Sequence, residues 1–303
     1  MAGAGVEDPQ ANDGRAPRKP PASSGIVPGL HIVATPIGNM GDITLRALDV
    51  LRAVDLVACE DTRVFAKLAR AHGIGAPTIA YADATQDAAE PRILSALAAG
   101  KRVALVSDAG MPLISDPGYR LVREALAADH KVTCVPGASA VPMALALSGL
   151  PTDRFLFAGF LPAKSTERRR AIGELSSVPA TLVFFEAPHR LPESLVDLAE
   201  LLGERPAAVA RELTKMFEEV RRATLGELAT HYAKNPDVKG EIVLVIGPPL
   251  ADAAPEAETI DRALREALAG ASVKDAASEV AARFGRQRRE IYARALELKR
   301  EKT

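Results

Sequence analysis

Short apolar runs alternate with helix-forming segments from residue 30 to residue 135, and this alternation limits the possible folds more than any other feature. The runs have the length of strands, and each ends in a polar or glycine-containing loop. They occupy 30–34, 55–59, 78–81, 103–106 and 131–135, with helices expected at 43–53, 65–72, 88–98 and 119–128. Asp42 is the expected N-cap of the first helix. Strands separated by helices in this order predict a parallel, doubly wound α/β sheet.

A second series of the same kind begins after Leu150-Pro-Thr-Asp153, with strands expected at 155–158, 181–185, 207–210 and 242–246. We therefore predict two α/β domains, 29–149 and 150–249, with a ligand cleft between them. Residues 1–28 have the composition of a disordered tail, and 250–259 that of a linker. Three helices, at 260–268, 274–284 and 288–299, are expected to form a small helix-turn-helix-like module at 260–303. Ser272 and Asp275 fit a capping box there, and Gly285 a helix-ending glycine.

Composition excludes several classes of protein. The net charge of −1 creates no overall field that would attract nucleic acid, so such binding would need a local basic patch. Cys59 and Cys134 end apolar runs with no Cys/His cluster nearby, which predicts two buried thiols, no disulfide and no metal site. No run is long enough to span a membrane, and the N-terminus lacks the apolar core of a signal peptide. We expect a soluble, cytoplasmic protein without a membrane partner.

The loop after the run at 103–106 has the highest density of potentially functional side chains. Ser107 and Ser115 supply hydroxyls, Asp108 and Asp116 supply carboxylates, and the glycines allow close approach of a ligand. In open α/β sheets, ligands bind beyond the carboxyl ends of the strands, where this loop lies. The alternative is an ordinary turn before a helix capped near Asp116-Pro117.

The same pattern recurs after the run at 55–59, where Glu60-Asp-Thr-Arg63 places four polar residues at a strand end. These residues are a second candidate site, although Asp61 or Thr62 would also suit the N-cap of the next helix. The loop after the first strand, Thr35-Pro-Ile-Gly38, has Pro36 where a dinucleotide-binding loop would have its first glycine. This departure disfavours a nicotinamide-dependent oxidoreductase.

Six ordered motifs resemble those of one family. They are Ala34-Thr-Pro-Ile-Gly-Asn39, Glu60-Asp-Thr-Arg63, Ser107-Asp-Ala-Gly-Met-Pro-Leu-Ile-Ser-Asp-Pro-Gly118, Pro136-Gly-Ala-Ser-Ala140, Phe185-Glu-Ala-Pro-His-Arg190 and Arg211-Glu-Leu-Thr-Lys215. Together they resemble the tetrapyrrole methylase superfamily, and within it the RsmI branch. The resemblance implies two α/β domains with S-adenosylmethionine in the cleft between them, and a homodimer. It also implies 2′-O-methylation of a cytidine in the decoding centre of 16S ribosomal RNA in the small ribosomal subunit.

The resemblance assigns candidate residues to the cofactor. They are Ser107, Asp108, Ala109, Gly110, Met111, Pro112, Ser115, Asp116, Pro136, Gly137, Ala138, Ser139, Gly159, Gly240, Glu241 and Ile242. Methyl transfer from a sulfonium is an in-line displacement, so catalysis can rest on positioning and electrostatics without a metal. A ribose hydroxyl still needs a base, and four candidates remain open: Glu60, Asp61, Glu212 and Lys215.

Basic residues give candidate contacts to RNA phosphates. They are Arg63, Lys164, Arg168, Arg169, Arg170, His189, Arg190, Arg286, Arg288 and Arg289. A solvated helix face is the commoner explanation of a run such as that at 164–170, and His189 is equally typical of a capping or packed histidine. Residues 283–303 hold eight lysines or arginines against three glutamates, which suits an RNA-facing surface or a helix packed on a partner subunit.

Four hypotheses follow. The favoured one is a ribosomal RNA ribose methyltransferase. A small-molecule methyltransferase acting on a tetrapyrrole would use the same fold and cofactor, but the basic C-terminal module and the Thr-Pro-Ile-Gly loop disfavour it. A nicotinamide oxidoreductase lacks its fingerprint loop. A non-catalytic RNA-binding protein would have no need of so many polar strand-end loops.

Overall fold

The structure is a computed structural model that describes residues 25–249, 257–284 and 286–301. Residues 1–24 of the predicted tail, most of the predicted linker and Gly285 lie outside these residues. The chain forms two compact units, 1–139 and 140–303. Helix α5 (Ala140–Ser148), which we assigned to the first domain, belongs to the second unit, where it packs on strands of that unit's sheet.

The first unit is a five-stranded parallel sheet in the order β3-β2-β4-β1-β5. The strands are β1 (Gly29–Val33), β2 (Leu56–Cys59), β3 (Thr78–Ala80), β4 (Arg102–Val106) and β5 (Val132–Val135). Helices α1 (Leu45–Ala53), α2 (Thr62–His72), α3 (Gln86–Ala98) and α4 (Tyr119–Ala127) connect them. One face packs against α1 and α2 and the other against α3 and α4, which confirms the doubly wound α/β sheet.

Several local predictions for this unit need correction. Thr44, not Asp42, caps α1, because its side chain accepts a hydrogen bond from the backbone of Ala47. Asp42 instead lies in a short 3₁₀ helix, η1 (Met40–Asp42). Cys59 is buried as expected, but Cys134 is exposed because β5 is an edge strand. Helix α4 begins at Tyr119 after Gly118, with no side-chain cap from the preceding loop.

The second unit has a five-stranded mixed sheet in the order β6-β7-β10-β8-β9. Its strands are β6 (Phe155–Phe160), β7 (Thr181–Glu186), β8 (Pro206–Arg211), β9 (Glu219–Thr224) and β10 (Ile242–Ile246). Only β6 and β7 are parallel, so the second unit does not repeat the architecture of the first. Strand β9 was not predicted, because its sequence Glu-Val-Arg-Arg-Ala-Thr is an edge strand without an apolar run.

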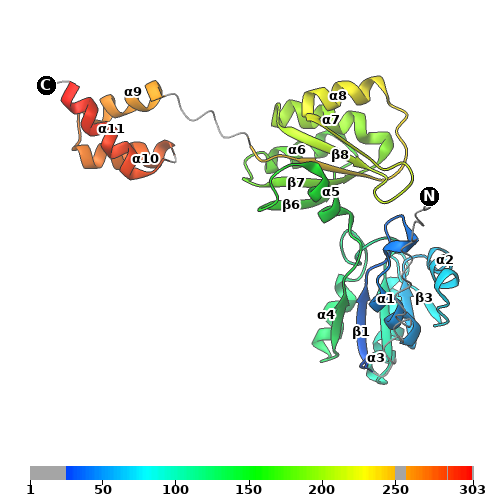
Figure 1. Ribbon diagram of the computed structural model, residues 1–303. Helices are drawn as coiled ribbons and strands as arrows, with labels where there is room; N and C mark the ends of the chain where they lie inside the picture. The colour runs from blue at the N-terminus through cyan, green and yellow to red at the C-terminus, as the bar shows by residue number, and fades with distance from the viewer. Residues whose placement is uncertain (1–24, 250–256, 285, 302–303) are drawn as a thin grey trace, which may run out of the picture. The chain divides into compact units, whose positions relative to one another are not determined.

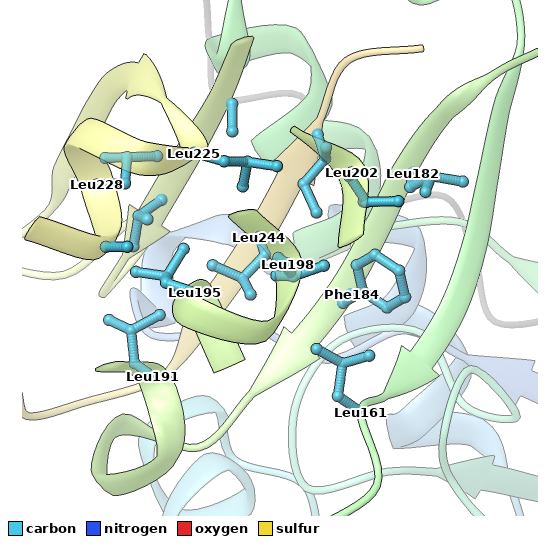
Figure 2. Packing of buried hydrophobic residues seen from close by; sticks show 14 of the residues in the cluster. Leu161, Leu182, Phe184, Leu191, Leu195, Leu198, Leu202, Leu225, Leu228 and Leu244 are labelled. Atoms are coloured by element: carbon cyan, nitrogen blue, oxygen red, sulfur yellow. The ribbon is translucent and has the colours of Figure 1, made fainter. Parts of the chain in front are cut away.

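Helices α6 (Ser165–Leu175), α7 (Leu191–Leu202) and α8 (Leu225–Lys234) cover one face of this sheet, with a short 3₁₀ helix, η2 (Pro188–Arg190), before α7. Figure 2 shows Leu195 and Leu198 of α7 gathered with Phe184 and Leu244 of the sheet. Helix α5 packs on the strands β8, β9 and β10. The carboxyl ends of β6 and β7 therefore lie at one edge of a sheet with a rigid core.

Three further helices follow: α9 (Ala257–Ala267), α10 (Val273–Phe284) and α11 (Arg288–Glu301), drawn in orange to red in Figure 1. Leu264, Val280 and Ile291 contribute to a core of their own. The predicted cap is present, because Ser272 Oγ accepts from the backbone N–H of Asp275 at 3.2 Å. None of the helices that the structure describes has the length and apolar character of a membrane span.

Candidate functional site

Carboxylates gather at the carboxyl ends of β2 and β4, which are neighbours in the first sheet. Oδ1 of Asp108 accepts a hydrogen bond from the backbone N–H of Asp61 at 3.0 Å, and so ties the two strand ends together. Burial raises the pKa of the Glu60 carboxyl, and the charge of Asp108 raises it further. The sheet therefore brings together the loops at 60–63 and 107–118, as their strand-end positions predict.

Asp116 belongs to the same acidic cluster. Burial raises the pKa of its carboxyl to about 6, and the charges of Glu60 and Asp108 add to this, against a hydrogen bond with Ser107. Asp83, in the loop after β3, is close enough for its charge to raise the pKa of Glu60 as well. Asp83 was not among the predicted site residues, although its place two residues after the predicted strand at 78–81 was an available signal.

The backbone of the loop at 107–118 is held in an unusual conformation. Gly110 and Thr35 exchange two backbone hydrogen bonds, 2.8 and 3.1 Å long, and the Thr35 hydroxyl donates to the carbonyl of Ser107 at 3.1 Å. Leu113 and Ser115 have φ of 72° and 65°, a region that non-glycine residues rarely adopt. Backbone strain of this kind concentrates at ligand sites, where the surrounding structure holds it in place.

The loop after β5 closely approaches two other loops, the one after β1 and the one at 107–118. A Cβ on Gly137 would lie 2.8 Å from Cβ of Ala34, so only glycine fits without a shift. The Cys134 thiol lies 3.9 Å from the sulfur of Met111. The predicted cofactor residues of the first unit thus come from two loops, after β4 and after β5, which both contact the loop after β1. They are Ser107, Asp108, Ala109, Gly110, Met111, Pro112, Ser115, Asp116, Pro136, Gly137, Ala138 and Ser139.

A second polar cluster lies within the second unit. Nζ of Lys215 lies 2.8 Å from Oε1 of Glu212 and 3.0 Å from Oε2 of Glu241. Glu212 and Thr214 have φ of 51° and 66°, and Gly240 leaves the space that the Glu212 carboxylate occupies. The loop at 211–215 is therefore as tightly constrained as the one at 107–118.

The charges in this cluster are fixed by its hydrogen bonds. Lys215 lowers the pKa of Glu212. Burial opposes the charge on Lys215, but the hydrogen bonds that it donates to Glu212 and Glu241 outweigh this effect and raise the pKa of the lysine. Lys215 is therefore protonated at neutral pH and has no lone pair with which to accept a proton.

The remaining cofactor predictions fall on the second sheet. Gly159 has a φ of 69° at an irregularity in β6. Ile242 is buried in the core, so its side chain is not available to a ligand. No structural observation tests these two positions or 240–241 as cofactor contacts, and they stay predictions.

The basic run at 164–170 lies on α6, and one of its arginines is a structural group. The Arg168 side chain is 3% exposed, with Nε 2.6 Å from Oδ2 of Asp197, which corrects its assignment to an RNA surface. Arg169 also pairs with Asp197, at 2.7 Å, and Arg190 with the buried Glu186, at 2.9 Å. The predicted RNA contacts with exposed side chains are Arg63, Lys164, Arg170, His189, Arg286, Arg288 and Arg289.

Asp61 serves as a helix cap. Its side chain accepts from the backbone N–H of Arg63 at 2.8 Å and pairs with the Arg63 guanidinium, which together lower the pKa of the carboxyl to about 2. The capping alternative is therefore confirmed for this residue. Across the described ranges, no group of three or more histidine, cysteine or acidic side chains has the arrangement of a metal site.

Comparison with known proteins identifies the family. The profile of the Tetrapyrrole (Corrin/Porphyrin) Methylases matches residues 29–229, and that of the RsmI C-terminal HTH domain matches residues 253–299. Proteins named ribosomal RNA small subunit methyltransferase I are similar along most of the chain. The one from Mesorhizobium japonicum is 53% identical, over 90% of this chain and 92% of its own length. The one from Xylella fastidiosa is 48% identical, over 87% and 97%.

Solved structures agree on the fold. Cobalt precorrin-4 methyltransferase CbiF, a cobalamin biosynthetic enzyme, has a TM-score of 0.54 and 20% identity, over 72% of this chain and 94% of its own. A diphthine synthase has a TM-score of 0.56 and 16% identity, over 72% and 89%. The two profile matches and the level of identity to these relatives lead to one conclusion: the chain belongs to the RsmI branch of the tetrapyrrole methylase family.

Proposed function

We propose that this protein uses S-adenosylmethionine to methylate the 2′-oxygen of a cytidine ribose in the decoding centre of 16S ribosomal RNA. The observation that carries the proposal is the acidic cluster of Glu60, Asp108 and Asp116 beside a strained loop, in a chain 53% identical to a protein named ribosomal RNA small subunit methyltransferase I. The homodimer and the cytoplasmic location that the resemblance implies are part of the same proposal.

The residues of the first unit fit this cofactor. S-adenosylmethionine carries a sulfonium and an α-ammonium group, and two close carboxylates with raised pKa values are stabilised in their charged forms by a cation. Asp108, fixed by the backbone of Asp61, is placed to accept hydrogen bonds from a ribose or an amino group. When bound, the cofactor supplies an electrophilic methyl group. The strained loop at 107–118 offers backbone groups to hold it.

Among the four candidate bases, Glu60 fits best. Its pKa is raised by burial and by Asp108, so it holds a proton more readily than an ordinary glutamate. Asp61 is paired with Arg63 and has a pKa of about 2, which makes it a weak base. Lys215 is protonated, and its ammonium group lowers the pKa of Glu212. We propose that Glu60 accepts the proton of the 2′-hydroxyl. Glu212 and Lys215 would then hold the loop at 211–215 in its conformation.

The proposed RNA contacts are the exposed basic side chains, because phosphates are bound by accessible polar and basic groups. They comprise Arg63, Lys164, Arg170 and His189 in the two α/β units and Arg286, Arg288 and Arg289 in the C-terminal module. Arg168 and Arg190 are left out because their guanidinium groups are held by buried carboxylates.

The test is methyl transfer from radiolabelled S-adenosylmethionine to small ribosomal subunits from cells that lack this protein. We expect label in an alkali-resistant dinucleotide containing 2′-O-methylcytidine, because ribose methylation blocks alkaline cleavage. The Glu60→Gln variant is expected to bind the cofactor but to transfer at a rate at least about a hundredfold lower. Asp153→Asn, an exposed acid elsewhere, is the matched control.

Two outcomes would contradict the proposal. Label on a base, or at a nucleotide other than cytidine, would refute the specificity but keep the methyltransferase. Cofactor binding without any transfer to ribosomal subunits would favour the second hypothesis, a tetrapyrrole methyltransferase, and uroporphyrinogen and precorrin substrates would then be tried.

A further inference from the structure

Four of the eight phenylalanines of this chain lie on one face of β6 and β7. The parallel pairing places Phe155 opposite Thr181 and Phe157 opposite Val183. Because side chains alternate along a strand, these residues and Phe185 share the face opposite to Leu182 and Phe184, which lie in the core. The aromatic side chains are therefore on the face that α6, α7 and α8 do not cover.

A bulge at Gly159 brings the last ring to this face. The register shifts between Phe157 and Phe160, so that Phe160, rather than Gly159, pairs with Phe185. Gly159 has a φ of 69°, which permits the extra residue. Without the bulge, Phe160 would point to the core face.

The three rings at the carboxyl ends of these strands form a contact group, which we call the aromatic platform: Phe157, Phe160 and Phe185. Ring centroids of Phe157 and Phe185 are 4.8 Å apart, and those of Phe160 and Phe185 are 5.5 Å apart, both in edge-to-face geometry. Phe160 remains 55% exposed although its edge is supported by Phe185. A held ring with an open face suits stacking by another planar group.

Basic residues follow both of the strands that carry the platform. Arg190 joins the two strand ends, because it donates to the carbonyl of Leu161 at 3.3 Å and pairs with the carboxylate of Glu186 at 2.9 Å. The Glu186 side chain is fully buried, so its charge is neutralised inside the protein. The exposed side chains that follow the two strands include Lys164 and His189. A planar ligand linked to phosphates matches this combination.

The exposed area favours a small planar group over a protein. Phe160 is about half exposed, and this leaves about 100 Å² of ring surface open on the platform. A stable protein interface needs about 800 Å² on each partner. Single-stranded nucleic acid is bound by exposed aromatic rings on sheet faces together with nearby cations.

We propose that the aromatic platform stacks a nucleobase of the RNA substrate on Phe160, with Lys164 and His189 contacting its phosphates. This inference rests on the proposed function and names the part of the second unit that holds the RNA. Phe155 lies at the other end of β6, outside the ring contacts, and is not part of the platform.

The chain contains no tryptophan, so Phe160→Trp introduces a single fluorophore at the platform. Adding small ribosomal subunits from cells that lack this protein is expected to quench its emission, because a stacked base quenches an indole ring. The matched control, Phe155→Trp, places the same fluorophore on the same strand and is expected to stay unquenched. S-adenosylmethionine alone is expected to leave both unchanged.

Affinity gives the second readout. Phe160→Leu keeps an apolar side chain but removes the ring, and we expect its affinity for the subunits to fall at least about fivefold. Phe160→Trp is expected to retain wild-type affinity, and Phe155→Leu to change it less than twofold. Thermal unfolding and cofactor affinity of all four variants should match those of the wild-type protein.

The other outcomes would overturn the platform, the proposed function or both. Quenching of Phe160→Trp by S-adenosylmethionine alone would assign the ring to the adenine of the cofactor. A lower molecular mass of Phe160→Leu in light scattering would assign it to an interface between two copies of the chain. An unchanged affinity of Phe160→Leu for the subunits would refute stacking. If the wild-type protein still transferred methyl groups, the proposed function would stand without the platform. A wild-type protein that bound subunits without methyl transfer would refute that function alone, and one that bound no subunits would refute both.

Discussion

The backbone N–H of Asp61 donates to Oδ1 of Asp108 at 3.0 Å, and this bond joins the ends of β2 and β4 across 47 positions of sequence. The carboxylate of Asp108 thereby orients the loop that carries Glu60, while the carboxylate of Asp61 caps α2. The two aspartates have different tasks although both follow a strand of the same sheet.

Asp108→Ala is expected to weaken S-adenosylmethionine binding by about tenfold or more. The change removes a charged acceptor and frees the backbone of Asp61, and hydrogen bonds to charged groups contribute about 1.5–3 kcal/mol each. Isothermal titration calorimetry measures the affinity, and Asp153→Ala serves as the control for loss of an exposed acid. An unchanged affinity for Asp108→Ala would remove this residue from the cofactor site.

Asp116 is expected to make folding stability depend on pH. Its pKa is raised from 3.8 to about 6, so between these values the folded state binds more protons than the unfolded state and stability falls as pH rises. Asp116→Asn imitates the protonated form. It should unfold like the wild-type protein at pH 4 and be more stable by about 1–2 kcal/mol at pH 8. If the stability difference between Asp116→Asn and the wild-type protein were the same at pH 4 and pH 8, the raised pKa of Asp116 would be contradicted.

Cofactor binding gives a separate test of the same carboxyl. A cation beside Asp116 favours its ionised form, so binding at pH 6 should release a proton. Calorimetry in two buffers of different ionisation enthalpy measures this release, and Asp116→Asn should show less of it. Identical proton release by both proteins would place the cation elsewhere.

The fold of the first unit could be predicted because each of its strands is an apolar run buried in a parallel sheet. The second sheet could not be predicted as fully, because β9 presents Glu219, Arg221 and Arg222 at an edge and gives no hydrophobic signal. The relative direction of the strands could not be predicted either, because the runs at 207–210 and 242–246 have the same sequence pattern whether their strands are parallel or antiparallel.

The candidate site followed from sequence where it depended on strand ends. Glu60, Asp108 and Asp116 each follow a strand or lie in a strand-end loop, and the parallel sheet brings such positions together. The role of a charged residue was less predictable. Arg168 and Arg170 are two positions apart on one helix, yet one is buried on Asp197 and the other is exposed. Only the packing of α6 against α7 distinguishes them.

Asp197→Ala is expected to lower the free energy of unfolding by about 3–5 kcal/mol, because it leaves the buried Arg168 with only the exposed Glu193, at 3.7 Å, as an acidic partner. Urea denaturation measures the change. Arg170→Ala, on the exposed side of the same helix, should stay within about 0.5 kcal/mol of the wild-type protein. A small effect of Asp197→Ala would mean that the pair contributes little to folding.

We expect the exposed arginines of the C-terminal module to affect the binding of RNA but not the binding of the cofactor. Replacing Arg286, Arg288 and Arg289 together with glutamine is expected to weaken binding to small ribosomal subunits at unchanged cofactor affinity. If all three contact phosphates, the slope of log affinity against log salt should fall in magnitude by about 2. Arg262→Gln removes an exposed charge from α9 and is the control, while Arg294 is left intact because it pairs with Asp261 at 2.6 Å and supports the fold. An unchanged salt slope in the triple variant would show that this surface faces something other than RNA.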